Sequence, residues 1–282
     1  MVANPLLGVF FHWLGGLASA SFYVPYKCIK LWSWEVFWIT GGIFSWGIAP
    51  WLFASLRTHD LIGVLGAAPH ATLLWCWFWG AMWGFGGLTF GLTMRYLGLS
   101  LGMAVALGLT TVIGTMGPPI FHGTLGGLAT TTSGQLTLMG IAVSLIGIIT
   151  VAKAGQAKGQ ELGDNAAGQG VAEFDLKKGL AIAVFSGIMS GCFAWGLDAG
   201  QPIRDLTLAA GTDPLSQGLP VLCVVLLGGL MTNLIWCGWL IWKNRSIGEF
   251  IGRVKAQDSE RPPLLINYLL AALGGTLWYF QF

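Results

Sequence analysis

The chain has 282 residues, of which 55% are hydrophobic and only 9% are charged, and its formal net charge is +2. Ordinary soluble domains carry about 25% charged residues, so this composition excludes a water-soluble fold and indicates an integral membrane protein. The sequence has no basic stripe that would bind nucleic acid, and its five cysteines form no C-x-x-C pair that would hold a metal.

Stretches without Asp, Glu, Lys or Arg show where helices can cross a bilayer, because a span needs about 20 apolar residues. They predict an all-α, polytopic membrane bundle with eight spans. In chain order the predicted spans are 5–26, 36–56, 71–94, 97–121, 135–152, 179–199, 218–242 and 264–282. Two intervening stretches, 61–70 and 122–134, are predicted to be loops. Nothing basic precedes Lys27, which argues against a cleaved signal peptide.

Lysine and arginine are distributed unequally between alternate connections. The odd-numbered connections hold 12 of these residues, whereas the even-numbered ones hold only Arg57 and Arg204. By the positive-inside rule, the N-terminus is expected to lie outside and the loops 153–178 and 243–263 in the cytoplasm. The mixed charges of both loops, interspersed with Gly, Gln and Ala, are typical of solvated linkers.

Two pairs of similar segments indicate an internal repeat. Residues 16–22 resemble residues 187–193, and Gly86-Gly87 resembles Gly274-Gly275. Both pairings fit a five-span repeat whose halves have opposite orientations, an arrangement found in many transporters.

The repeat predicts three domains. The first five-helix repeat covers 1–152, a cytoplasmic linker covers 153–178, and a second repeat of three helices covers 179–282. On this alignment Phe282 corresponds to Met94, so the last two spans of a ten-span fold are expected to be missing.

Motifs of soluble enzymes are absent from the sequence or out of place. It contains neither G-x-x-x-x-G-K-[ST] nor H-E-x-x-H, and the G-x-S-x-G at 98–102 lies at the start of a predicted span, where close helix packing explains it better. We therefore expect no enzyme activity. The alternative of a membrane-embedded transferase would need clustered acids or histidines at a membrane face.

Two ionisable side chains lie within the predicted spans, where burying a charge is costly and the group tends to face a cavity. His12 lies about 10 Å from the outer end of the first span, and Asp198 lies near the outer end of the sixth. A histidine changes charge near neutral pH, and a partly buried carboxyl group can also hold a proton. Both are candidates for proton coupling. The alternatives are a hydrogen-bonding cavity residue for His12 and a solvated residue for Asp198.

Aromatic residues are concentrated in the first three spans, together with scattered amides and hydroxyls. A sugar has an apolar C–H face and a ring of hydroxyls, so such a mixture suits it. The substrate-binding candidates are Trp13, Tyr23, Trp83, Thr89, Thr93, Asn233 and Gln281. An interfacial aromatic belt is the alternative explanation for many of the tryptophans.

Several stretches resemble the L-rhamnose–proton symporter family. They are 11–15, 21–27, 32–35, 91–100, 173–179, 213–215 and 274–282, so the resemblance covers essentially the whole chain. It implies a ten-span, inverted-repeat carrier of the drug/metabolite transporter superfamily. Such a carrier moves L-rhamnose, or a related deoxysugar, together with a proton across the bacterial inner membrane by alternating access. The resemblance implies no cofactor besides the coupling proton.

Three further residues stand in motifs that resemble the family's. Arg95 is a cytoplasmic topology anchor or a member of a gating ion pair, and Tyr96 follows it. Glu35 favours the positive end of the second span's helix dipole, or it has a gating role. Asp198 stands where the family has an amide. Two alternatives stay open: a carrier of another metabolite or drug on the same fold, and a shortened member that does not transport. No oligomeric state follows from the sequence.

Overall fold

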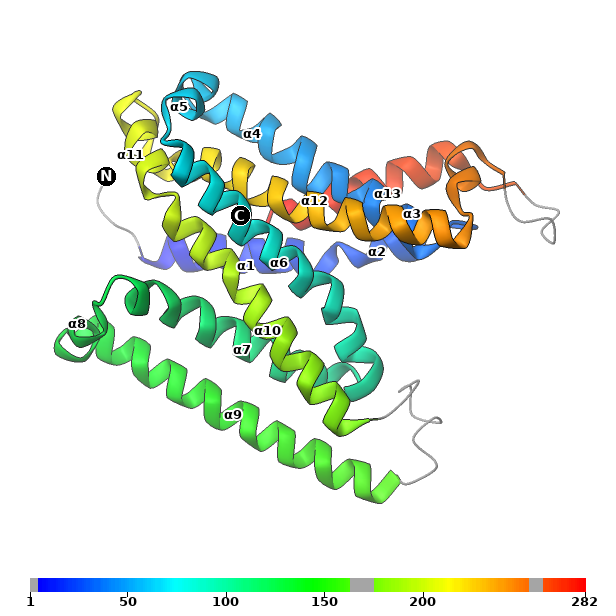
Figure 1. Ribbon diagram of the computed structural model, residues 1–282, viewed down its shortest axis with the longest axis horizontal. Coiled ribbons are helices and arrows are strands. Elements are labelled where there is room, and N and C mark those ends of the chain that lie inside the picture. The colour runs from blue at the N-terminus through cyan, green and yellow to red at the C-terminus, as the bar shows by residue number, and fades with distance from the viewer. Residues whose placement is uncertain (1–4, 163–174, 254–260) are drawn as a thin grey trace. The chain divides into compact units, whose positions relative to one another are not determined.

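The computed structural model describes residues 5–162, 175–253 and 261–282 (Figure 1). Over these ranges the chain is helical and has no strand, so the prediction of an all-α fold is confirmed. The chain folds into two compact units. The terminal unit combines Met1–Ala68 with Ile203–Phe282, and the central unit is Pro69–Pro202. Each unit contains helices from both halves of the predicted repeat.

Several helices are long and apolar enough to cross a membrane. Within the described ranges there are six, or seven if the helices Leu61–Ala67 and His70–Leu97, which meet at 104°, count as one bent span. The eighth predicted span corresponds to α13 (Leu264–Tyr279), whose 16 residues rise about 24 Å, less than the roughly 30 Å hydrocarbon core. The multi-pass prediction is confirmed, whereas the number eight stays a prediction.

The terminal unit contains α12 (Leu219–Asn244) and α13, each of which packs against helices of the unit's N-terminal part. Its N-terminal part contains α1 (Pro5–Ser21), α2 (Tyr23–Lys27), α3 (Trp34–Gly42), the π-turn η1 (Ile43–Ile48), α4 (Ala49–Arg57) and α5 (Leu61–Ala67). Helix α13 packs against α1, α2, α3 and η1, and α12 packs against α3, η1 and α4. The first two predicted spans and the last two therefore form one body.

The second predicted span, observed as the continuous segment Trp34–Arg57, changes its helical pitch in the middle. Pro50 has no N–H for the carbonyl of Trp46, and its ring crowds that carbonyl. In the preceding turn η1 the chain takes up one extra residue, so that the Ala49 N–H bonds to the Phe44 carbonyl five residues back. Such π-turns are frequent at functional sites.

Glycines let the backbones of the terminal unit approach closely. A Cβ atom on Gly275 of α13 would collide with the carbonyl oxygen of Gly41 on α3. The ring of Tyr26 lies against Gly274 in the same way, and a Cβ on Gly42 would lie 2.5 Å from the Trp46 ring. These contacts position the aromatic rings described below.

The central unit consists of α6 (His70–Leu97), α7 (Leu99–Phe121), α8 (Leu125–Thr130), α9 (Thr132–Leu162) and α10 (Leu176–Ala199). Helix α10 packs along both α6 and α7, and α9 packs against α7 (Figure 1). At the α6–α10 crossing, Ser186 Oγ donates to the Gly86 carbonyl at 2.9 Å. A Cβ on Gly86 would lie only 2.6 Å from the Ser190 backbone nitrogen, so glycine is needed there.

Several segments outside the predicted spans contain helix. Residues 61–67 form α5, because Asp60 caps that helix by accepting from the Gly63 N–H at 3.1 Å. Helix α8 lies within the predicted loop 122–134, and α11 (Gln201–Ala209) follows the sixth span. Helix α9 continues into the predicted linker as far as Leu162, because charged residues mark the edge of the membrane and not the end of a helix. Parts of the two predicted cytoplasmic loops, 163–174 and 254–260, lie outside the described residues.

Candidate substrate and proton sites

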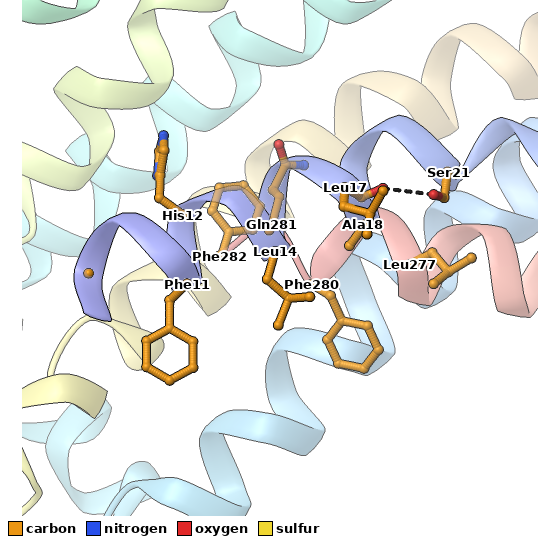
Figure 2. Close-up of a pocket in the computed structure, with 12 residues that line it drawn as sticks. Phe11, His12, Leu14, Leu17, Ala18, Ser21, Leu277, Phe280, Gln281 and Phe282 are labelled. Carbon is orange, nitrogen blue, oxygen red and sulfur yellow. Dashed lines mark hydrogen bonds between the residues drawn. The ribbon is translucent and has the colours of Figure 1, made fainter. Parts of the chain in front are cut away.

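A groove with a volume of about 730 Å³ lies between α1 and the end of α13 in the terminal unit (Figure 2). Two residues predicted for function, His12 and Gln281, line it together. The other lining residues are mostly apolar: Gly8, Phe11, Leu14, Gly15, Leu17, Ala18, Ser21, Leu277, Phe280 and Phe282. The groove therefore combines a few polar groups with a largely apolar wall.

Two polar side chains of the groove, those of His12 and Gln281, point in the same direction. In Figure 2 the imidazole of His12 and the carboxamide of Gln281 point to the same side of α1, and the rings of Phe11 and Phe280 point to the opposite side. Gln281 is held in place by the Ser19 hydroxyl, which donates to its Oε1 atom at 3.4 Å. Gly15 lets the Gln281 backbone come close to α1, since a Cβ there would lie 3.0 Å from the Gln281 carbonyl oxygen.

A second hollow lies among five aromatic rings of the same unit, which we call the aromatic cage: Phe22, Tyr26, Trp38, Trp46 and Trp278. Neighbouring rings are in contact. The distance between ring centroids is 6.3 Å for Tyr26 and Trp38 and 6.0 Å for Trp38 and Trp46. Trp46 and Trp278 meet edge to face at 5.9 Å. Gly42 and Ser45 complete the lining of this hollow.

One of the predicted substrate-binding residues, Asn233, forms a hydrogen bond to a ring of the aromatic cage. Asn233 of α12 accepts the indole N–H of Trp38 at 3.0 Å and donates to the Gly229 carbonyl at 2.9 Å. Tyr23 lies beside the cage, with its ring centroid 6.5 Å from that of Trp38. Trp13, by contrast, is 61% exposed and contacts the Phe10 ring at 6.1 Å.

Asp198, at the end of α10 in the central unit, has a partner that the sequence analysis did not assign. Its Oδ2 atom lies 2.7 Å from Nε2 of His122, which directly follows α7. The side chain of His122 is 61% exposed and that of Asp198 33% exposed. A hydrogen bond therefore joins two ionisable side chains that both reach solvent.

The remaining candidates of the central unit lie along α6. Thr89 and Thr93 donate to carbonyls of their own helix, at 2.9 Å to Phe85 and 3.3 Å to Thr89, so their hydroxyls keep only acceptor capacity. The Trp83 ring packs 5.2 Å from that of Phe193. At the end of α6, Arg95 is exposed and the Lys178 ammonium lies 4.3 Å above the Tyr96 ring.

Glu35 takes part in a reciprocal arrangement that we call the serine–glutamate clasp, formed by Ser33, Glu35, Asn244, Ser246 and Glu249. Glu35 is 4% exposed, and its Oε1 atom accepts from Ser246 Oγ and Asn244 Nδ2, both at 2.9 Å. In return Glu249 accepts from the Ser33 hydroxyl at 2.9 Å and from its backbone N–H. The clasp joins the start of α3 to the connection between α12 and α13.

Sequence reasoning missed Ser45, Trp278 and His122. The signal for Ser45 is Pro50 in the middle of a span, which predicts an irregular turn just before it. His122 directly follows the fourth predicted span, and Asp198 lies at the end of the sixth. In the predicted topology both of these span ends lie on the outer side of the membrane. Trp278 follows Gly274-Gly275 in the predicted repeat and in a stretch that resembles the family, but neither pattern assigns it to a hollow.

Known proteins resemble this chain along nearly its whole length. The sequence model of a family described as L-rhamnose-proton symport protein (RhaT) matches residues 1–282. A protein named L-rhamnose-proton symporter from Cronobacter sakazakii is 40% identical over 277 residues, which are 98% of this chain and 77% of that protein. One of the same name from Klebsiella pneumoniae is 42% identical, with coverage of 98% and 78%. No solved structure matches the chain.

Proposed function

The chain belongs to the L-rhamnose-proton symport protein family, and from this premise we propose that it takes up L-rhamnose, or a related deoxysugar, together with a proton across the bacterial inner membrane. This is a family of sugar–proton symporters and not of enzymes. The observation that carries the proposal is the family match over all 282 residues. The predicted periplasmic N-terminus and cytoplasmic loops belong to the same proposal.

The two hollows of the terminal unit support a sugar as the substrate. The groove offers His12, Gln281 and Ser21 on an otherwise apolar wall, and the cage offers indole and phenol rings. Ligand sites in proteins are mostly apolar, with a few placed polar groups that fix orientation. We assign sugar binding to these two hollows, with Gln281 in the groove and with Tyr23 and Asn233 beside the cage. Tyr23 and Asn233 do not line the cage themselves, but both contact Trp38 of the cage. Four other candidates line neither hollow, so their claim is weaker: Trp13, Trp83, Thr89 and Thr93.

The coupling proton has two candidate carriers. His12 lines the sugar groove, so its protonation is suited to change sugar affinity directly. Asp198 and His122 form a hydrogen-bonded pair that can take up and release a proton as one group. Protonation from outside favours sugar binding, and release to the inside empties both sites. Within a cell the membrane potential adds about 2.3 kcal/mol per charge per 100 mV.

Alternating access is proposed to operate through the inverted repeat. In that repeat the first span corresponds to the sixth and the third to the eighth. The observed packing of α6 with α10 within the central unit has its counterpart in the packing of α1 with α13 within the terminal unit. Both crossings use a close glycine contact, at Gly86 and at Gly15 respectively. This parallel supports the repeat. Glu35 in the clasp, and Arg95 with Tyr96, are the proposed gating residues.

The test is uptake of labelled L-rhamnose by right-side-out membrane vesicles that contain the protein. With a potential of about 100 mV, negative inside, and equal pH on both sides, one proton per sugar supports accumulation of up to about 50-fold. A protonophore should abolish accumulation while leaving equilibration intact. Vesicles without the protein provide the control. Uptake that never exceeds the external concentration would contradict the proposal.

A further inference from the structure

The hydroxyl of Ser45 is buried within the aromatic cage and makes no hydrogen bond in the described structure. Ser45 is 2% exposed, and its Oγ atom has no partner. A hydroxyl in a helix usually donates to the carbonyl four residues back, as Thr40 does to Val36 at 2.7 Å. Buried polar groups are nearly always paired, so an unpaired one needs an explanation.

The hollow beside this hydroxyl has the size of one small polar group. Its volume is about 10 Å³, which is close to the room that a single water molecule requires. A sugar hydroxyl has the same size, whereas a whole sugar ring is far larger. The hollow can therefore admit one substituent of a ring but not the ring itself.

The framework around the hollow is fixed in advance. The turn η1, which precedes Pro50, contains both Ser45 and Trp46, and the Trp46 ring lies directly on Gly42. Asn233 fixes the ring of Trp38 through the 3.0 Å bond to its N–H. Binding sites whose groups are held in place by such contacts lose little entropy when a ligand enters.

We infer that Ser45 recognises one ring hydroxyl of the transported sugar, which enters the aromatic cage while the ring stays outside against the aromatic wall. Because a hydroxyl both donates and accepts, Ser45 can pair with any sugar hydroxyl in either sense. In the sequence, Phe22 and Trp278 of the cage directly follow Ser21 and Leu277 of the larger groove. The volume of that groove accommodates the rest of the sugar. This inference rests on the proposed function, since it assumes that the substrate is a sugar.

The experiment measures binding of L-rhamnose and its mono-deoxy analogues to the purified protein in lipid nanodiscs. The wild type is compared with Ser45→Ala and with the matched control Ser55→Ala, which makes the same change at an exposed position of the same span. Ser45→Cys, of nearly the same size but a weak hydrogen-bonding group, serves as a second variant if Ser45→Ala does not fold.

The expected result is selective. The wild type should bind one of the mono-deoxy analogues at least about tenfold more weakly than L-rhamnose, and Ser45→Ala should bind these two sugars equally. Ser55→Ala should match the wild type. If Ser45→Ala instead weakens all sugars by one common factor, or weakens none, Ser45 does not contact a hydroxyl and the inference is overturned although the proposed function stands. If the wild type does not bind L-rhamnose, both fall.

Discussion

Nε2 of His122 lies 2.7 Å from Oδ2 of Asp198, which joins the end of α7 to the end of α10 in the central unit. Both side chains reach solvent, so this pair contributes at most about 1 kcal/mol to stability. The pair therefore does little to hold the fold together, and the role that we propose for it is proton coupling.

If the pair carries the coupling proton as one group, its two members act together. We expect Asp198→Asn and His122→Ala each to reduce gradient-driven accumulation of L-rhamnose by at least about tenfold, with no further loss in the double variant. Exchange of internal for external sugar should persist, because the fold is unchanged. His59→Ala, at another exposed histidine, is the control. Independent, multiplying effects of the two single changes would argue against a shared proton.

His12 differs from this pair because it lines the sugar groove. We expect His12→Gln to raise the Kd for L-rhamnose by about tenfold, because the imidazole lines the groove and is replaced by a side chain of different shape and hydrogen-bonding groups. The measurement is sugar binding to the purified protein, with His70→Gln as the control. A His12→Gln variant that binds as the wild type does would remove His12 from sugar binding.

Adjacent glycines on α6 provide a matched test of packing in the central unit. A Cβ on Gly86 would lie 2.6 Å from the Ser190 backbone nitrogen, whereas one on Gly87 would meet nothing within 4 Å. Gly86→Ala should therefore lower stability by about 1–3 kcal/mol, because α6 and α10 must move apart. Gly87→Ala should leave it unchanged or raise it slightly. Thermal unfolding in detergent measures both, and equal effects of the two changes would contradict the observed crossing.

The serine–glutamate clasp makes a prediction about the terminal unit. Glu35→Ala removes the acceptor of two hydrogen bonds and leaves the buried Ser246 hydroxyl unpaired, so stability should fall by about 2 kcal/mol. Glu35→Gln keeps one acceptor oxygen and should lose clearly less. Thermal unfolding again gives the comparison. If Glu35→Ala unfolded at the same temperature as the wild type, the clasp would not contribute to the stability of the protein.

The membrane class and the helical fold could be predicted from the sequence because they depend on simple quantities. A chain with so few charges can cover its surface only with lipid, and lipid allows only helices or closed barrels. The ends of helices were less predictable. Asp60 starts α5 in a predicted loop by capping it, and α9 continues past Lys153 to Leu162, because helices do not end where the membrane does.

The sites were predictable only in part, because they depend on which helices meet. His12 and Gln281 are 269 residues apart in the chain, and only the packing of α1 on α13 places them in one groove. Ser45 is indicated only indirectly, by Pro50 in the same span, because its place in the aromatic cage depends on a change in helical pitch. The predicted domain boundaries at 152 and 178 come from the symmetry of the sequence. The two compact units are defined by which helices pack together, so they do not test the repeat, and it stays a prediction.

Proton movement caused by the sugar itself tests the central claim most directly. L-rhamnose is added to lightly buffered, de-energised vesicles that contain the protein, and the external pH is recorded. Symport predicts an immediate external alkalinisation, which a protonophore abolishes and which vesicles without the protein lack. Entry of labelled L-rhamnose without any change in external pH would contradict the account.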